Sequence, residues 1–308
     1  MNLRNKYQEK LQRAIAQNDF PNAIYFVKAL EIINRISIGE SVELGNKEWE
    51  LTLKNELKEN FNPDIKRRLS LSASSIETYV QCPLKYRFQQ IDKIPPKPNN
   101  PTLIFGSVIH KVLENFHENK GELSEQKIIE ILNKEWESVE FEYSIRKGKF
   151  KEQAVDILKR YVEISGKDKP DVLATEYEFF FDMDNVRIKG KIDRIDNGNS
   201  GKKVIDYKTS KKSSAAKDSI QLAIYCIYLE QDGKESLKGI PESATLYFLR
   251  DEEQPKHSHS FTKTELDMTR NKIKEVAQNI RASNFEPIKG AHCEWCDYKN
   301  LACPVWES

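Results

Sequence analysis

A turn between two short apolar segments constrains the fold of this chain more than any other stretch of its sequence. Residues 186–195 and 204–208 are rich in Val and Ile, and an Asn-Gly and a Ser-Gly pair lie between them. Such pairs favour tight turns, so the stretch predicts an antiparallel hairpin centred between positions 199 and 200. In that register Asp193 and Asp206 are equally far from the centre and lie opposite each other on neighbouring strands.

The predicted hairpin places two carboxylates and a lysine on one face. Carboxylates directly opposite each other repel, and Mg²⁺ or Mn²⁺ removes that conflict because both ions prefer oxygen ligands. Lys208 follows Asp206 by two residues, so the pleat puts its ammonium on the same face, where it can offset charge developing on a phosphate. The plainer interpretation is a solvated hairpin rich in Asp and Lys, and a register slip would separate the two carboxylates.

Around this hairpin the residue periodicity predicts an α/β domain. Helices are expected in residues 1–60 and at about 75–90, 108–119, 124–138, 150–165, 218–230 and 264–282, with further strands near 176–181 and 244–249. Asp218 with Gln221, and Thr262 with Glu265, fit capping boxes for the last two helices. We therefore expect a sheet of three or four strands flanked by helices within residues 69–308, preceded by a helical N-terminal extension in residues 1–68.

Charge and hydropathy narrow the setting of the protein. No apolar run approaches the roughly 20 residues of a spanning helix, and the charged N-terminus lacks the apolar core of a secretory signal. We therefore expect a cytoplasmic protein with no membrane partner. The net charge of +1 gives no overall case for nucleic acid, but residues 202–217 hold six lysines against one aspartate. This local patch can follow a phosphate backbone, and a solvated basic loop is the alternative.

Two helices carry further candidate site residues. His110 lies beside the apolar face of its predicted helix, and a neutral imidazole is a good ligand for a divalent metal. Gln221 and Tyr225 are four residues apart, so they share one helix face and can hold a phosphate or position Lys208. Taken singly, an exposed histidine, a surface glutamine and a half-buried tyrosine are the plainer interpretations.

The cysteines indicate ligation rather than disulfides. Cys293, Cys296 and Cys303 lie within eleven residues of one another, and Cys82 is the available distant partner. Four thiolates can hold a tetrahedral Zn²⁺ or an iron–sulfur cluster, and the spacing leaves both open. Cys226 lies in an apolar run and is interpreted as a small core residue.

Taken together, these motifs resemble the RecB-like branch of the PD-(D/E)XK nuclease superfamily, over about residues 69–304. The closest likeness is to its iron–sulfur members, namely AddB-type nuclease domains and CRISPR-associated spacer-acquisition exonucleases. The resemblance rests on the segment 71–86, Phe105-Gly106-x3-His110, Gly190-x2-Asp193-Arg194-x-Asp196, Asp206-Tyr207-Lys208-Thr209 and Gln221-x3-Tyr225.

The resemblance implies a role for each of these residues. His110, Asp193, Asp206 and the carbonyl oxygen of Tyr207 would be metal ligands, and Lys208 would be the catalytic lysine. Gln221 and Tyr225 would support the positioning of DNA or of the lysine. A 4Fe-4S cluster would be bound by the four cysteines Cys82, Cys293, Cys296 and Cys303.

The function expected from the residues and the resemblance is a metal-dependent DNA nuclease. Exonuclease action in repair, recombination or defence is favoured, and a helicase or a CRISPR adaptation complex is the expected partner. The alternative is a non-catalytic iron–sulfur protein that binds DNA as a scaffold. The motifs leave open the polarity of cleavage, the strand preference, the pathway, the oligomeric state and the purpose of residues 1–68.

Overall fold

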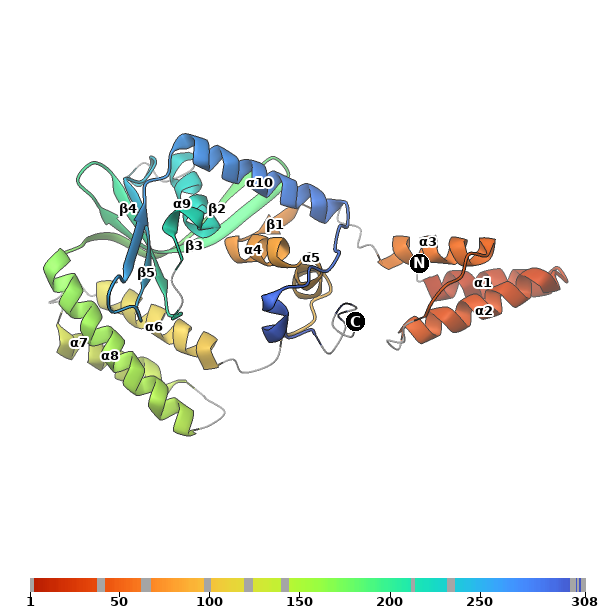
Figure 1. Ribbon diagram of the computed structural model, residues 1–308, viewed down its shortest axis with the longest axis horizontal. Helices are drawn as coiled ribbons and strands as arrows, with labels where there is room; N and C mark the ends of the chain where they lie inside the picture. Colours follow the sequence, from red (N-terminus) through yellow and green to blue (C-terminus); the bar gives the residue numbers. More distant parts are fainter. Residues whose placement is uncertain are drawn as a thin grey trace.

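The computed structural model describes residues 3–37, 42–61, 68–96, 101–118, 124–139, 144–211, 214–231, 236–299, 303 and 305. Residues 62–67, which precede the predicted boundary between residues 68 and 69, lie outside the described residues. Three helices come first: α1 (Leu3–Ala16), α2 (Phe20–Ser37) and α3 (Glu48–Phe61). They surround a core of their own, which comprises Leu3, Tyr7, Ala29, Ile33, Leu53 and Leu57 (Figure 1).

A mixed sheet forms the centre of the rest of the molecule. Within the described chain it has six strands: β1 (Leu69–Leu71), β2 (Asp171–Met183), β3 (Val186–Asn197), β4 (Lys202–Lys208), β5 (Ser243–Phe248) and β6 (Lys256–His259). One edge of β3 pairs with β2, antiparallel. The other edge pairs first with β1, in parallel, and then with β4, antiparallel. β5 lies parallel to β4, and β6 is antiparallel to β5.

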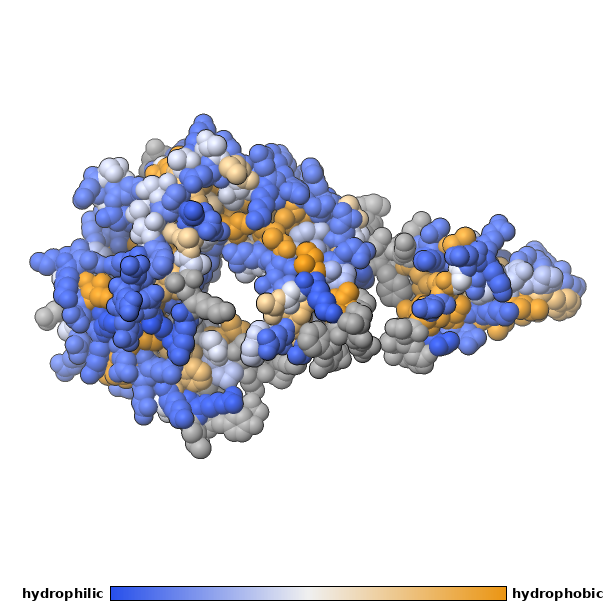
Figure 2. Space-filling view, viewed as in Figure 1, coloured by the Kyte–Doolittle hydropathy of each residue, from blue (hydrophilic) through white to orange (hydrophobic). Residues whose placement is uncertain are grey.

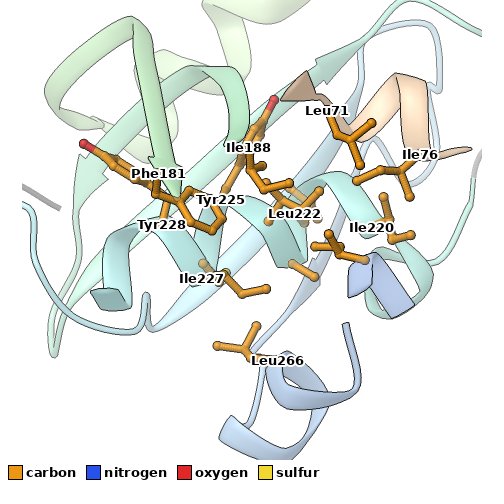
Figure 3. Packing of buried hydrophobic residues seen from close by; sticks show 14 of the residues in the cluster. Leu71, Ile76, Phe181, Ile188, Ile220, Leu222, Tyr225, Ile227, Tyr228 and Leu266 are labelled. Carbon is orange, nitrogen blue, oxygen red and sulfur yellow. The ribbon is translucent and has the colours of Figure 1, made fainter. Parts of the chain in front are cut away.

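Helices cover both faces of this sheet (Figure 1). One face packs on α6 (Pro101–Glu118), α7 (Glu125–Glu137) and α8 (Ser144–Asp168), through a core that includes Ile205, Tyr207 and Tyr247. The other face packs on α4 (Ala73–Gln81), α9 (Ile220–Gln231) and α10 (Lys263–Arg281). Figure 3 shows this second core, where Ile188 of β3 meets Leu222 of α9. The α/β class and the flanking helices are as expected.

Several local expectations were wrong. The helix expected at 75–90 ends at Gln81, because Pro83 follows an extended Cys82; α5 (Pro83–Tyr86) and a π-helical turn (Arg87–Ile91) continue the chain. The sheet has more strands than the three or four expected. β1 and β6 were not predicted because strands of three and four residues are too short to show a periodicity in the sequence.

Helix starts also differ in part from the expected caps. The backbone N–H of Leu222 bonds to the hydroxyl of Ser219, so α9 starts at a serine rather than at a capping box formed by Asp218 and Gln221. The capping box of Thr262 and Glu265 is confirmed. Among the described helices, none has both the length and the apolar character that crossing a membrane requires.

Candidate active site

The hairpin has the register expected from the sequence. Arg194 pairs with Ile205, and Ile195 pairs with Val204, so the centre lies between positions 199 and 200. The ladder of paired residues ends at Arg194 and Ile205, and Asp193 and Asp206 are the next residues beyond this pair. Beyond it, the backbone N–H of Tyr207 donates to Asp193 Oδ2 at 2.7 Å. The two carboxylates therefore lie where β3 and β4 begin to separate.

A chain of polar contacts joins Lys208 to α9. Lys208 Nζ lies 2.8 Å from Asp206 Oδ2 and donates to Gln221 Oε1 at 2.7 Å. Gln221 Nε2 in turn donates to the Tyr225 hydroxyl at 2.6 Å. That hydroxyl lies 2.7 Å from the carbonyl oxygen of Lys191 and 3.2 Å from Asp206 Oδ1. The structure thus brings together four of the residues selected from the sequence.

A second cluster faces α6. His110 Nδ1 lies 3.5 Å from Asp193 Oδ1 and 3.6 Å from Glu176 Oε1. One ligand atom from each of these residues lies within 4.8 Å of the other two, and no other group of this kind occurs in the described ranges. Asp206 lies outside the trio, although it is close enough to Asp193 for the two charges to interact.

Sequence reasoning missed Glu176. It lies in β2 with a φ of 44°, a left-handed conformation that is rare in a strand. The neighbouring pairs are Thr175 with Arg194 and Tyr177 with Ile192, so Glu176 and Asp193 face each other outside the regular ladder. In the sequence, Glu176 is one acidic residue among aromatic ones; its only available signal was its place in a strand beside the hairpin.

Burial and charge shift the pKa values of the clustered groups. Burial would lower the pKa of His110, but the Asp193 and Glu176 carboxylates outweigh it and raise that pKa to about 10. Burial, followed by the neighbouring Asp193 charge, raises the pKa of Asp206 to about 6 despite the nearby Lys208. The site thus favours the charged form of His110 and disfavours the charged form of Asp206.

The donor set fits a divalent cation. Two carboxylates and an imidazole are ligands that Mn²⁺ accepts, and Mg²⁺ takes one or two carboxylates plus water. A cation bound by His110 would compete with a proton for the imidazole nitrogen, because a histidine ligand must be neutral. Asp206 Oδ2 is buried beside this trio and lies 2.8 Å from the Lys208 ammonium, which offsets the carboxylate charge there.

A cleft of about 640 Å³ opens over both clusters. Its walls come from α4, α6, β2, β3 and α9, and include the residues Ser72, Leu103, His110, Glu176, Lys189 and Gln221. Gly106 of α6 lies against the end of β4, where an added Cβ would come 3.2 Å from Thr209 Oγ1. The absence of a side chain there lets the helix that carries His110 approach Thr209, which also lines the cleft.

A buried arginine supports the floor of the site. Arg194 is 5% exposed and donates to the hydroxyls of Tyr161 and Tyr207 and to Asp196 Oδ2. Its guanidinium also lies 3.3 Å from Nε2 of His117 on α6. This network ties α6 and α8 to the strands on which Asp193 and Asp206 lie.

Some lysines of the predicted basic patch, residues 202–217, are engaged in contacts within the protein. Lys202 donates to Asn197 Oδ1, and Lys203 forms an ion pair with Glu242 at 3.4 Å. Lys208 belongs to the site, and Lys212 lies outside the described residues. The patch thus contributes less open positive charge than its composition indicated.

The cysteines are placed but do not form a ligand group. All five are free; Cys82 and Cys226 are buried, and the three near the C-terminus are partly exposed. No cysteine belongs to a group of three ligand atoms within 4.8 Å in the described part of the chain. The core position expected for Cys226 is confirmed, and burial raises the pKa of its thiol to about 12.

Comparison with known proteins identifies the family. Residues 70–304 match the family model of the PD-(D/E)XK nuclease superfamily. The "Gene 69 protein" of Mycobacterium phage L5 is 26% identical over 298 residues, covering 79% of this chain and 99% of the phage protein. A Clostridium botulinum protein named as a subunit of an "ATP-dependent helicase/deoxyribonuclease" is 25% identical over 258 residues, covering 69% of this chain but 22% of that protein. A solved structure from Eubacterium rectale aligns with 80% of this chain and 94% of its own, at 15% identity and a TM-score of 0.47.

The family model spans the sheet, the helices on both of its faces and every residue of the two polar clusters. A match over this much of the sequence establishes that the chain belongs to the PD-(D/E)XK nuclease superfamily.

Proposed function

We propose that this chain is a metal-dependent deoxyribonuclease that cuts phosphodiester bonds in the cleft between α6 and β3. The observation that carries the proposal is the convergence of His110, Glu176 and Asp193 next to the Asp206–Lys208 pair. A structural hairpin has no need to bury three carboxylates beside one another, whereas a cation-dependent hydrolase does.

The proposed chemistry assigns one role to each cluster. A divalent cation, when bound, supplies positive charge for the phosphate and activates water for attack. His110, Glu176 and Asp193 would hold that cation, with Asp206 and the carbonyl oxygen of Tyr207 as further ligands. Lys208 would orient the attacking water or offset the charge on the phosphate.

Gln221 and Tyr225 act through Lys208 and Asp206. The Gln221 amide accepts from the ammonium and donates to the tyrosine hydroxyl, which faces the carboxylate. This chain of contacts restricts the rotamers of both catalytic groups. We therefore propose them as positioning residues.

Mutation of the lysine tests the proposal. Lys208→Ala should abolish cleavage of end-labelled single-stranded and duplex DNA in Mg²⁺ or Mn²⁺, while the melting temperature stays near that of the wild type. Lys203→Ala removes a nearby lysine whose ion pair, within the described chain, is with Glu242; this variant is the matched control and should cut normally. Full activity in the Lys208 variant would exclude this site.

The same assay separates the nuclease from the scaffold alternative. A scaffold protein would bind the labelled DNA and leave it intact at every metal concentration. Substrates labelled at either end would also show whether the enzyme is an exonuclease, which we favour, and in which direction it proceeds.

We further propose that Cys82, Cys293, Cys296 and Cys303 bind a structural 4Fe-4S cluster, with Zn²⁺ as the alternative. The thiolate donor set suits both groups. The C-terminal segment contacts the chain on either side of Cys82 in sequence: the Tyr79 hydroxyl donates to the carbonyl of Asn284, and the Tyr298 hydroxyl donates to that of Ile94. Iron, zinc and sulfide analysis of anaerobically purified protein distinguishes the two groups.

We propose residues 1–68 as a separate extension that contacts a helicase or another DNA-processing partner. The support is an apolar row on α2, where Phe20, Ile24 and Val27 are more than half exposed. Figure 2 shows apolar residues along these helices. Cytoplasmic location and a role in repair, recombination or defence are part of the same proposal.

A further inference from the structure

The cleft continues past the proposed cation site along β3. Ile188 and Ile192 are fully buried against the α9 side of the sheet, so Lys189 and Lys191 between them point to the opposite face. Both lysines line the cleft. They are two residues apart, about 6.6 Å along a strand, which is comparable to the spacing of successive phosphates in an extended polynucleotide.

The two lysines differ in their partners. Lys191 forms an ion pair with Glu176, so its charge is committed to the cation site. Lys189 is exposed, and no ion pair involves it in the described parts of the chain. Its open ammonium lies one step farther along the strand from the site.

An exposed aromatic ring lies beside Lys189. Phe180 of β2 is the direct cross-strand partner of Lys189, so the two side chains share a face. Its ring is 62% exposed, although phenylalanine is among the residue types most often buried. The guanidinium of Arg187 lies 4.8 Å from the ring centroid and is held by Asp182, so one neighbour of the ring is fixed.

We propose that Lys189 and Phe180 form a nucleotide subsite next to the scissile position, in which Lys189 binds a backbone phosphate and Phe180 stacks with a base. An exposed cation beside an exposed aromatic ring supplies the two elements of single-strand recognition, a backbone contact and a stacking surface. The subsite rests on the proposed nuclease function. In this arrangement, the DNA strand that leaves the cation site runs along β3, away from β4. The phosphate is either an internal linkage or the terminal phosphate of a strand end.

Substrate modification tests the phosphate contact. End-labelled single strands would carry one neutral methylphosphonate linkage, moved position by position around the cleavage site. With the wild type, one linkage should slow cleavage roughly tenfold, the effect of losing one charge-assisted contact. The Lys189→Ala variant should cleave unmodified DNA more slowly than the wild type by a similar factor. The methylphosphonate at the sensitive linkage should not slow this variant any further. An equal further loss in the variant would overturn the proposal, as would a wild type that is insensitive both at every linkage and to a terminal phosphate.

Parallel experiments test the aromatic contact and the source of the phosphate. An abasic nucleotide at one position should slow the wild type but not Phe180→Ala, and equal slowing of both would refute stacking. Sensitivity to a terminal phosphate, with no sensitive internal linkage, would assign the subsite to a strand end. Lys263→Ala, an exposed lysine at the start of α10, is the control and should behave as wild type; melting curves verify that the variants are folded.

The subsite and the nuclease function can fail separately. If the wild type binds DNA without cutting it, the nuclease proposal is wrong, and the same linkage scan measured as binding affinity decides the subsite. Unchanged affinity in Lys189→Ala would then overturn it. If the wild type does not bind DNA at all, both proposals are wrong, and a protein partner becomes the remaining occupant of this surface.

Discussion

At the scale of single residues, the cation site depends on an acid with an unusual backbone. Glu176 adopts a positive φ that costs an ordinary residue of order 1–3 kcal/mol, and the strand retains it beside Asp193. Strained residues of this kind gather at functional sites, which agrees with the role proposed for its carboxylate.

Replacing this carboxylate by an amide tests that role. Glu176→Gln should weaken Mn²⁺ binding at least tenfold in calorimetric titration, because the amide keeps the shape but loses the charge. Glu178→Gln, two residues along the same strand and exposed, is the matched control and should bind Mn²⁺ like the wild type. Equal binding by all three proteins would remove Glu176 from the site.

Gly190 shows a second backbone requirement. It pairs across strands with Phe179, and an added Cβ would lie 2.6 Å from the tip of that ring. The ring is held by its stack with Tyr228, so it has little room to move. Gly190→Ala should lower the free energy of unfolding by about 1–3 kcal/mol in urea denaturation.

A glycine in open space provides the contrast. Nothing lies within 4 Å of a Cβ added at Gly166 in α8, so Gly166→Ala should stabilise by about 1 kcal/mol through helix propensity. Equal effects at the two glycines would contradict the close approach of Phe179 to Gly190.

At the scale of elements, α6 is held to the sheet through a buried polar network, and this makes stability depend on pH. Burial, followed by the Arg194 charge, lowers the pKa of His117 to about 3. The unfolded chain binds this proton near the ordinary pKa of about 6.5, so the folded state loses stability as the pH falls from that value towards 3.

His117→Gln should reduce this loss. Between about pH 7 and pH 5, the free energy of unfolding should fall less in the variant than in the wild type. His257→Gln, at a histidine outside this network that bonds to the carbonyl of Gln254, should keep the wild-type slope. Parallel curves for all three proteins would show that His117 is not held neutral.

Elements with strong local signals could be predicted from the sequence, and the others could not. The register of β3 and β4 followed from one turn, and Asp206, Lys208, Gln221 and Tyr225 followed from strand and helix spacing. β1 and β6 escaped because three or four residues carry no periodicity, and their pairing is decided by distant strands. Glu176 escaped because its position depends on an irregular pair between β2 and β3, which no local pattern encodes.

At the scale of the whole molecule, a hydrophobic core formed by α1, α2 and α3 indicates that the proposed extension can be separated from the nuclease domain. The cluster around Leu53 shares no residue with either core of the sheet. A chain lacking residues 1–61 should therefore keep the melting transition of the α/β body and its cleavage rate. Loss of that transition in circular dichroism would show that the helices support the sheet.

The central claim is that His110, Glu176 and Asp193 hold the cation that cleavage requires. The most direct measurement is the rate of cleavage of end-labelled DNA as Mn²⁺ is titrated into metal-free wild type and Asp193→Asn protein. The account predicts a wild-type rate that rises to saturation and disappears with EDTA, and no cleavage by the folded Asn variant. Cleavage that continues in EDTA, or a wild-type rate in Asp193→Asn, would contradict it.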